Sequence, residues 1–325
     1  MKATAIAPSN IAFIKYWGKK DDELRLPTNG SISMNLSGLT TTTTVEFSLD
    51  YKKDLIEIDG NKNKKEIDRV IKHLDRIRNI AGIDKKAKVV SKNNFPSGTG
   101  LSASASGFAA LTVAAVSAAD LKLTEKELSI LARFGSGSAC RSIPDGFVEW
   151  LDGDTSDESC AVSLHEANWW DIVDVVAIVN LGKKDVPTTK GMEIAGSSPF
   201  FQARLSSIDN KIKIAKKVLE KKDFTRFGKL LESEALEMHA IAITSSPSLI
   251  YWTSGTLGVM KQVKMWRKAG FESYFTINTG QDIHIICQKH DAIKISNLLK
   301  NQKDVRDVII NMPSNGARLV NNHLF

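Results

Sequence analysis

Residues 93–107 constrain the fold of this chain more than any other stretch. They read Asn-Asn-Phe-Pro-Ser-Gly-Thr-Gly-Leu-Ser-Ala-Ser-Ala-Ser-Gly and run directly into the alanine-rich segment 108–116. Glycine permits unusual φ angles, and alanine is a strong helix former. We therefore expect a loop that feeds the N-terminus of an apolar helix.

The beginning of such a helix is suited to binding an anion. The first-turn N–H groups have no partner within the helix, the helix dipole is positive at this end, and the serine hydroxyls add further donors. The candidate phosphate-binding residues are Gly100, Ser102, Ser104 and Ser106. No Gly-Lys-Ser/Thr follows, so the stretch is not a Walker loop. A serine–alanine linker or an ordinary capped helix is the alternative interpretation.

Composition limits the class of ligand. The 325 residues are 42% hydrophobic, which is enough for two domains with proper cores. The net charge of +7 is compatible with nucleic acid, an anionic membrane or a small acidic substrate. The basic residues are dispersed and lack the interleaved aromatic residues of single-strand binders, so we expect no nucleic-acid partner.

The cysteines and the apolar segments indicate a reducing compartment. Cys140, Cys160 and Cys287 have neither zinc-ligand nor disulfide-scaffold spacing, so we expect structural thiols. No run approaches the roughly 20 apolar residues of a membrane span. We expect a cytoplasmic protein with no membrane partner and no metal site of its own, any metal entering with a nucleotide.

Periodicity and residue type predict a chain of mixed strands and helices. Strands are expected at 2–14, 40–49, 87–90, 146–151, 173–181, 272–277, 282–288 and 305–310. Helices are expected at 65–81, after 107, after 124, at 199–243 with a break near 222, at 257–269 and at 293–300. Residues 15–36 and 182–190 are expected to be loops. This uneven segregation favours an α+β fold, with domains at 1–182 and 183–325.

Three cations lie next to glycines. Lys15 and Lys19 flank a Tyr-Trp-Gly sequence, and Arg141 ends a small-residue cluster at 135–142. Cations in such settings can hold a polyanionic small molecule. Solvated surface charge is the alternative for any one of them.

Three motifs resemble the diphosphomevalonate decarboxylases. They are Ala-Pro-Ser-Asn-Ile-Ala-Phe-Ile-Lys-Tyr-Trp-Gly-Lys at 7–19, the glycine–serine stretch with its sequel at 93–109, and Gly-Ser-Gly-Ser-Ala-Cys-Arg-Ser at 135–142. Shorter matches lie at 198–201, 238–240 and 275–280. The similarity covers nearly the whole chain. The family belongs to the small-molecule kinase superfamily of galactokinase, homoserine kinase and mevalonate kinase.

The resemblance implies both a fold and a reaction. The fold would have an N-terminal mixed sheet with helices, a C-terminal ferredoxin-like α/β sandwich and a cleft between them. In this family, ATP with magnesium phosphorylates the tertiary 3-hydroxyl of a mevalonate phosphate ester. Loss of phosphate and carbon dioxide then gives an isopentenyl ester. Family analogy also suggests a homodimer.

By position in the motifs, Lys15 would lie near the C3 substituent. The residues that would bind the carboxylate and the 5-phosphate end are Tyr16, Lys19, Ser138 and Arg141. Lys190 falls where some members carry an arginine. The superfamily phosphate loop corresponds to residues 96–106.

Position 278 departs from the family pattern. Family members have an aspartate there that helps to deprotonate the 3-hydroxyl, whereas this chain has Asn278. A neutral amide cannot act as a general base. Asp282, four positions later, should not occupy the same point. The usual Leu-Ala-Ser-Ser-Ala of the phosphate loop also reads Leu-Ser-Ala-Ser-Ala here. The candidate catalytic residues are Lys15, Arg141 and Asn278.

Three explanations of Asn278 compete. The one ranked first is decarboxylation of mevalonate 3,5-bisphosphate without ATP or another cofactor, for which no base is needed. An amide also removes repulsion against the 3-phosphate, about 4 kcal/mol for unit charges 4 Å apart at an effective dielectric of 20. The second is an ATP-dependent decarboxylase whose base has been disabled by substitution. The third is a natural diphospho- or monophosphomevalonate decarboxylase that uses another base.

Other interpretations receive less support from the sequence. A non-catalytic homologue that binds an isoprenoid intermediate is disfavoured because Lys15, Lys19, Ser138 and Arg141 are retained together. His239 is expected to be a satisfied buried or supporting histidine. His284 alternates with isoleucines on a strand, so it either lines the cleft or meets solvent.

Overall fold

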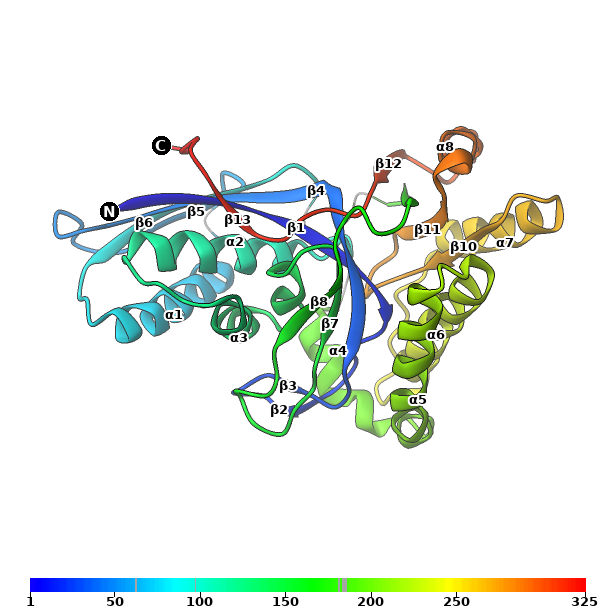
Figure 1. Cartoon of the computed structure of the whole chain (residues 1–325), viewed down its shortest axis with the longest axis horizontal. Coiled ribbons are helices and arrows are strands. Elements are labelled where there is room, and N and C mark those ends of the chain that lie inside the picture. Colours follow the sequence, from blue (N-terminus) through cyan, green and yellow to red (C-terminus); the bar gives the residue numbers. More distant parts are fainter. Residues whose placement is uncertain (62, 97, 181, 183–185) are drawn as a thin grey trace.

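The computed structural model describes residues 1–61, 63–96, 98–180, 182 and 186–325. The chain forms two lobes, each built on its own β-sheet (Figure 1). In Figure 1 the N- and C-termini both lie over the first lobe, so the end of the chain returns to its beginning.

The first lobe is a seven-stranded mixed sheet with helices on one face. Its central path runs β13-β1-β4-β6-β5, while β7 pairs with β4 and β8 pairs with β7. The strands are β1 (Lys2–Ile14), β4 (Ser31–Ser48), β5 (Leu55–Ile58), β6 (Lys86–Asn93), β7 (Phe147–Trp150), β8 (Ala161–His165) and β13 (Arg318–Val320). Among the described strand pairs of this sheet, β5 and β6 run parallel and the others antiparallel. The covering helices are α1 (Lys64–Ala81), α2 (Ala103–Ala118) and α3 (Glu125–Gly135).

Helix α2 is the centre of this lobe. Its alanines lie against β1 and β4 with no exposed area at Ala109, Ala110 and Ala114. Small side chains let the helix approach the sheet closely, so the loop at its N-terminus is held by a rigid, buried element. The expected transition from loop to helix is present, but the helix begins at Ala103 and not after residue 107.

Strand β4 differs from the expectation of a loop over 15–36. It begins at Ser31, because residues 31–35 pair with β1 on one side and β7 on the other. A register shift between Pro8 and Asn10 of β1 accommodates this long partner. The alternation that marks a one-sided strand is missing because this part of β4 is buried throughout.

The second lobe is a four-stranded sheet in the order β10-β11-β9-β12 with helices packed on it. Its strands are β9 (Ile172–Ile178), β10 (Ser273–Thr276), β11 (Ile283–Gln288) and β12 (Asp307–Asn311). Its helices are α5 (Phe201–Glu220), α6 (Phe224–Thr244), α7 (Ser254–Lys268) and α8 (Ala292–Lys300). One apolar cluster packs α7 and α8 against this sheet. A second cluster packs α5 and α6 against other residues of the same sheet. The α+β class and the break near residue 222 agree with the sequence.

The expected division at residue 182 falls in a loop of which residues 181 and 183–185 lie outside the described residues. Two pairings cross that division. Strand β9, before it, lies at the centre of the second sheet, and β13, after it, pairs with β1 in the first sheet. The loop expected over 182–190 also leads into a helix, α4 (Thr188–Ile194), that starts after Pro187.

Shorter elements complete the chain. They are β2 (Lys19–Asp21), β3 (Leu26–Pro27) and the 3₁₀ turns η1 (Gly137–Ser142), η2 (Ala195–Ser197) and η3 (Lys289–Asp291). All three cysteines are free and buried, as expected of structural thiols. None of the helices that the structure describes is long and apolar enough to cross a membrane.

Candidate active site

A cavity of about 440 Å³ lies where the two lobes meet. The first lobe contributes the end of β1, the loop before α2, and η1. The second contributes Met238 of α6 and the loop residues Asn278 and Thr279. Segments that are far apart in the sequence therefore form one site.

Two glycine-containing loops touch at the centre of this cavity. A Cβ built on Gly100 would lie 2.6 Å from the Cα of Gly280, and one on Gly280 would lie 2.3 Å from the carbonyl oxygen of Thr99. No side chain fits in either place. This close approach brings Asn278 of the late loop against the start of α2.

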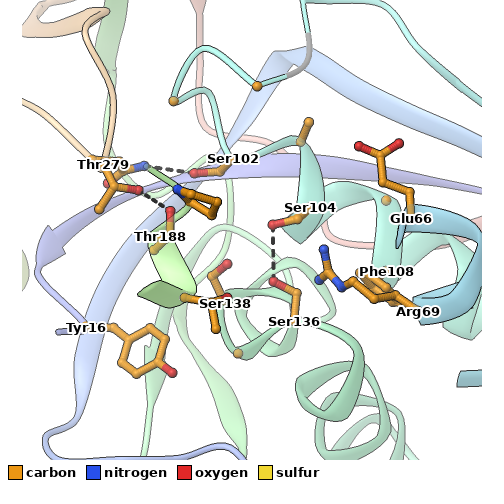
Figure 2. Close-up of a pocket in the computed structure, with 18 of the residues that line it drawn as sticks. Tyr16, Glu66, Arg69, Ser102, Ser104, Phe108, Ser136, Ser138, Thr188 and Thr279 are labelled. Carbon is orange, nitrogen blue, oxygen red and sulfur yellow. Dashed lines mark hydrogen bonds between the residues drawn. The ribbon is translucent and has the colours of Figure 1, made fainter. Parts of the chain in front are cut away.

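The residues before α2 present hydroxyls and a free helix N-terminus to the cavity. Ser102 has a left-handed φ of 60°, and its side chain does not cap the helix. Its hydroxyl instead accepts a hydrogen bond from Asn278 Nδ2 at 3.0 Å (Figure 2). Ser104 Oγ lies 3.2 Å from Ser136 Oγ across the cavity wall. Gly100, Ser102 and Ser104 all line the cavity, in positions suited to a phosphate.

Ser106 does not join them. Its side chain is fully buried, its hydroxyl lies 2.6 Å from Thr41 Oγ1, and it is absent from the described cavity lining. One helical turn beyond the N-terminus, the residue faces the sheet rather than the cavity. The structure therefore does not bring Ser106 together with the other three candidate phosphate-binding residues. Ser97, also in the expected loop, lies outside the described residues.

The side chain of Lys15 reaches the cavity, although only 1% of the residue is exposed to solvent. Its Nζ donates to the carbonyl oxygen of Ala12 at 2.6 Å and to Asn278 Oδ1 at 3.3 Å. Burial holds the pKa of Lys15 well below its usual value, and the nearby charge of Arg141 lowers it further. Glu234 opposes this shift.

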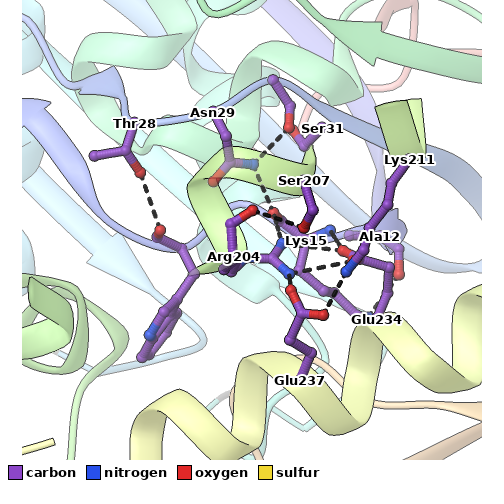
Figure 3. Close-up of polar contacts among 12 residues, drawn as sticks. Ala12, Lys15, Thr28, Asn29, Ser31, Arg204, Ser207, Lys211, Glu234 and Glu237 are labelled. Atoms are coloured by element: carbon purple, nitrogen blue, oxygen red, sulfur yellow. Dashed lines mark hydrogen bonds and ion pairs between the residues drawn. The ribbon is translucent and has the colours of Figure 1, made fainter. Parts of the chain in front are cut away.

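The backbone of Lys15 is held by a buried ion-pair cluster (Figure 3). Its N–H donates to Glu234 Oε2 at 3.1 Å, and its carbonyl oxygen accepts from Arg204 at 2.9 Å. Arg204 and Glu234 are paired at 3.0 Å, and Lys211 and Glu237 complete the cluster. Burial alone would raise the pKa of Glu234, but Arg204 and Lys211 hold it below its usual value. Helices α5 and α6 thus fix the position of a first-lobe lysine.

Arg141 is buried with neutral partners. Its guanidinium donates to Ser33 Oγ at 3.0 Å, Ser31 Oγ at 2.6 Å and Asn10 Oδ1 at 3.1 Å. No carboxylate in the described part of the chain forms an ion pair with it. Burial lowers its pKa, yet an arginine remains charged in proteins. A buried cation of this kind requires an anion from outside the chain.

Three other predicted ligands line the same cavity. Lys19 forms an ion pair with the exposed Asp22. Tyr16 packs edge-on against Trp150 with ring centroids 4.6 Å apart, and burial raises its pKa. Ser138 also lines the cavity, and Figure 2 shows it between Tyr16 and Ser136. Lys190 is different, because it is exposed on α4 and is not among the described lining residues. Other positions of that helix, Thr188 among them, face the cavity instead, and substrate binding by Lys190 stays a prediction.

Two histidines and an aspartate lie behind the cavity. His239 donates from Nε2 to the carbonyl oxygen of Asn278 at 3.0 Å, and burial lowers its pKa to about 3. It is the satisfied supporting histidine that was expected. Asp282 accepts from the N–H of Val179 at 3.0 Å and does not line the cavity. His284 is buried 2.9 Å from Asp174, so it neither meets solvent nor lines the described cavity wall.

The sequence did not reveal Arg25, Glu66 or Arg69, which also line the cavity. Arg25 has a left-handed φ of 53°, and no hydrogen bond joins it to a residue that the structure describes. Arg69 donates to the carbonyl oxygen of Gly135 at 3.0 Å and covers the ring of Phe108. No local motif surrounds these residues, so only tertiary contact brings them to the site.

The cavity is strongly positive and has an apolar end. Among its described lining residues, Glu66 is the one carboxylate, and the cations are Lys15, Lys19, Arg25, Arg69 and Arg141. The apolar end beyond Ser104 is formed by Ile58, Val70, Val89, Phe108 and Leu111. Such a lining suits two polyanions, one of which carries a flat apolar group. Within the described chain, no group of three His, Cys, Asp or Glu side chains is placed to hold a metal ion.

Comparison with known proteins identifies relatives along the whole chain. Residues 7–161 match the diphosphomevalonate decarboxylase-like N-terminal domain, and residues 174–318 match the mevalonate 5-diphosphate decarboxylase C-terminal domain. The diphosphomevalonate decarboxylase of Candida albicans is 34% identical over 315 residues, covering 91% of this chain and 87% of that protein. The phosphomevalonate decarboxylase of Haloferax volcanii is 34% identical over 287 residues, covering 88% of each.

A solved structure shows the same architecture. The mevalonate diphosphate decarboxylase from Enterococcus faecalis, in a structure that concerns mevalonate diphosphate-mediated ATP binding, superposes with a TM-score of 0.91. It is 33% identical, and the match covers 99% of each chain.

Proposed function

This chain belongs to the diphosphomevalonate decarboxylase family and is a carboxy-lyase acting on a phosphorylated mevalonate, and we propose that it uses ATP to do so. The substrate would carry a phosphate or diphosphate on C5. Named relatives of both kinds, the fungal diphosphomevalonate and the archaeal phosphomevalonate decarboxylase, are equally similar at 34% identity. The number of phosphates therefore has to be decided by experiment.

The observation that carries this proposal is the buried, carboxylate-free setting of Arg141. Three neutral oxygens orient its guanidinium, and Lys15 lies in the same cavity with neutral partners of its own. A mevalonate phosphate ester brings a carboxylate that Arg141 would neutralise, and a 3-oxygen that Lys15 would contact. Lys19, Tyr16, Arg25 and Ser138 would hold its phosphorylated end.

The second half of the cavity supports a nucleotide as co-substrate. The N-terminus of α2 with Ser102 and Ser104 suits a chain of phosphates, and the pocket around Phe108 suits a purine ring. When bound, ATP supplies the phosphoryl group that makes the 3-oxygen a leaving group. Magnesium would arrive with its phosphates.

The residues of the chain would then assist the departure of that group. The C3–O bond breaks and its electron pair leaves with the phosphate, while the C1–C2 bond breaks to release carbon dioxide and form the C2–C3 double bond. Cations around the leaving phosphate stabilise the charge that develops on it. Arg141 would hold the carboxylate until it leaves.

A second candidate function rests on Asn278. Decarboxylation of mevalonate 3,5-bisphosphate without ATP needs no base, and an amide at position 278 avoids a carboxylate next to the 3-phosphate. The relatives named above support the ATP-dependent function instead, so we place it first. A non-catalytic binding protein is a third possibility, which any turnover would exclude.

One set of assays separates these functions. Purified protein is given diphosphomevalonate or phosphomevalonate with Mg-ATP, or mevalonate 3,5-bisphosphate alone, and both ADP and carbon dioxide are measured. We expect ADP and carbon dioxide in equal amounts from one of the ATP-containing mixtures. Carbon dioxide from the bisphosphate alone, with no ADP from either other mixture, would establish the second candidate. The expected homodimer is tested separately by sedimentation.

A further inference from the structure

The amide at position 278 leaves the proposed phosphorylation without an obvious proton acceptor. Glu66 is the one carboxylate in the described lining, and Figure 2 shows it beyond Ser104, beside Arg69 and away from Ser102. His239 uses its N–H on a backbone carbonyl and does not line the cavity. Asp282 accepts a backbone N–H outside the described lining.

Lys15 Nζ donates two side-chain hydrogen bonds, which is the number that a neutral amine can donate. A neutral amine has two N–H bonds and one lone pair, and two acceptors lie within reach of Nζ. They are the carbonyl oxygen of Ala12 at 2.6 Å and Asn278 Oδ1 at 3.3 Å. With both N–H bonds directed to these oxygens, the lone pair remains for a ligand in the cavity that Lys15 lines.

Burial favours the neutral form of Lys15, and the charges around it act in both directions. From η1 comes Arg141, and from α5 comes Arg204, both of which disfavour a further positive charge. Glu234 of α6 and Asp174 of β9 act in the opposite direction. Glu234, however, is already paired with Arg204 and Lys211, and Asp174 lies against His284. His239, also of α6, adds no positive charge beside Lys15, because burial lowers the pKa of His239 to about 3 and keeps its ring neutral.

We propose that the neutral amine of Lys15 is the general base of this enzyme, and that Asn278 orients it. This inference rests on the proposed ATP-dependent function. The Lys15 lone pair takes the proton of the 3-hydroxyl as that oxygen bonds to the γ-phosphorus and the bond to ADP breaks. The resulting ammonium lies beside the new 3-phosphate and returns the proton to it as the C3–O bond breaks. The amine is then ready for another cycle.

The side chain at position 278 decides which residue can be the base. A carboxylate there would stabilise the ammonium form of Lys15 and could accept the proton itself. An amide oxygen accepts the same N–H without adding negative charge. An amide in place of a carboxylate at position 278 would therefore transfer the role of proton acceptor from residue 278 to Lys15, with which it is in contact.

The first experiment titrates Lys15 without substrate. Protein labelled with ¹⁵N-lysine is followed by NMR between pH 6 and 11, and the Lys15 signal is assigned by its loss in Lys15→Arg. We expect Lys15 to titrate at least one pH unit below the exposed Lys289, and at a higher pH in Asn278→Asp. Titration of Lys15 together with Lys289 would overturn the inference, whatever the assays of function show.

The second experiment measures the pH dependence of kcat for ADP formation. Because the base must be deprotonated, we expect wild-type kcat to fall tenfold per unit as pH drops below the Lys15 titration. The kcat of Asn278→Asp should not fall in this way above pH 6. The kcat values of the wild type and the variant should therefore converge toward high pH. A constant ratio of the two rates across the pH range would overturn the inference and indicate a disabled base.

The third experiment removes the amine. Lys15→Arg places a permanent positive charge at this position and cannot accept a proton, so we expect kcat to fall by about 100-fold or more. Lys15→Ala should regain activity with added alkylamines, and the rescue should increase with amine basicity. Lys289→Met is the matched control and should keep wild-type kcat. Retention of more than a tenth of kcat in Lys15→Arg would overturn the inference, whereas absence of ADP from the wild type would overturn the proposed function instead.

Discussion

Two groups of buried charge lie side by side in this protein and behave differently. In the first, Arg204 and Lys211 meet Glu234 and Glu237, so that its charges cancel within the chain. In the second, the side chains of Lys15 and Arg141 donate hydrogen bonds to neutral oxygens, and neither forms an ion pair within the described chain. Arg204 and Glu234 of the first group are buried, as are Lys15 and Arg141 of the second, whereas Lys211 and Glu237 are partly exposed.

The difference separates a structural device from a binding site. The self-neutralised cluster holds the Lys15 backbone from α5 and α6, so it positions the site without facing the ligand. In the second group, the guanidinium of Arg141 is buried without a counter-ion, and binding of an anionic substrate would offset this cost. Removing a charge should therefore damage folding in the first group and function in the second.

The largest effect is expected from Glu234→Gln. This change leaves Arg204 without its main counter-ion, so the free energy of unfolding should fall by about 3–5 kcal/mol. Urea unfolding measures it. The double variant Arg204→Met/Glu234→Met should lose less than the two single changes summed. A loss below about 1 kcal/mol in Glu234→Gln would remove the distinction between the groups.

Arg141→Met should show the opposite pattern. Loss of a charge-assisted contact worth about 3 kcal/mol lowers kcat/KM by roughly 100-fold. The melting temperature should stay close to that of the wild type, because a buried unpaired cation has been removed. Steady-state kinetics and thermal unfolding are measured on the same preparation, with Arg141→Lys as the charge-retaining control. Substantial unfolding with unchanged kinetics would contradict the assignment.

Acid should weaken the fold through the two histidines that burial keeps neutral. The pKa values of His73 and His239 are each lowered to about 3, so the unfolded chain binds protons that the folded chain does not. Stability is complete above about pH 6.5 and falls below it by about 1.4 kcal/mol per pH unit for each histidine. Urea unfolding at pH 6 and pH 5 measures the slope. His239→Gln should remove about half of it, and an unchanged slope would argue against a neutral His239.

A smaller effect is expected at Arg25, which belongs to the unpaired group but is only partly buried. Arg25→Gln should raise the KM for the mevalonate substrate by about tenfold, corresponding to one charge-assisted hydrogen bond of about 1.5 kcal/mol. The value of kcat should change less. If KM for ATP rises instead, Arg25 binds the nucleotide and not the 5-phosphate end.

The smallest effect is expected at Lys190, which lies outside the described cavity lining. Lys190→Met should change kcat/KM by less than twofold. The measurement uses the same assay as for Arg25→Gln. A loss of tenfold or more would show that α4 turns this lysine toward the substrate during turnover.

The parts of the site that the sequence predicted are those in which local chemistry and position coincide. Gly100, Ser102 and Ser104 follow from a small-residue loop before an apolar helix, and all three line the cavity. Ser106 looks the same in sequence but faces Thr41, because one further turn rotates it toward the sheet. The pattern of residue types does not indicate which side of the helix Ser106 faces.

The fold shows the same division. The helices of the second lobe were evident from their apolar period, and β9 from its continuous apolar run. The first part of β4 was missed because strands on both sides bury it, and β13 because its three residues become a strand only by pairing with β1. Long-range pairing overrides weak local preference.

The sequence by itself determined the family, the α+β class and the identity of the amide at position 278, since these are properties of residue types and their order. The tertiary structure alone decided that Asn278 meets both Lys15 and Ser102, that Arg25 and Arg69 join the cavity, and that one cluster of buried charge is neutralised while its neighbour is not. The physical reason is that the proton affinity and pairing of a side chain depend on burial and on groups brought close through space. Segments hundreds of residues apart supply those groups here.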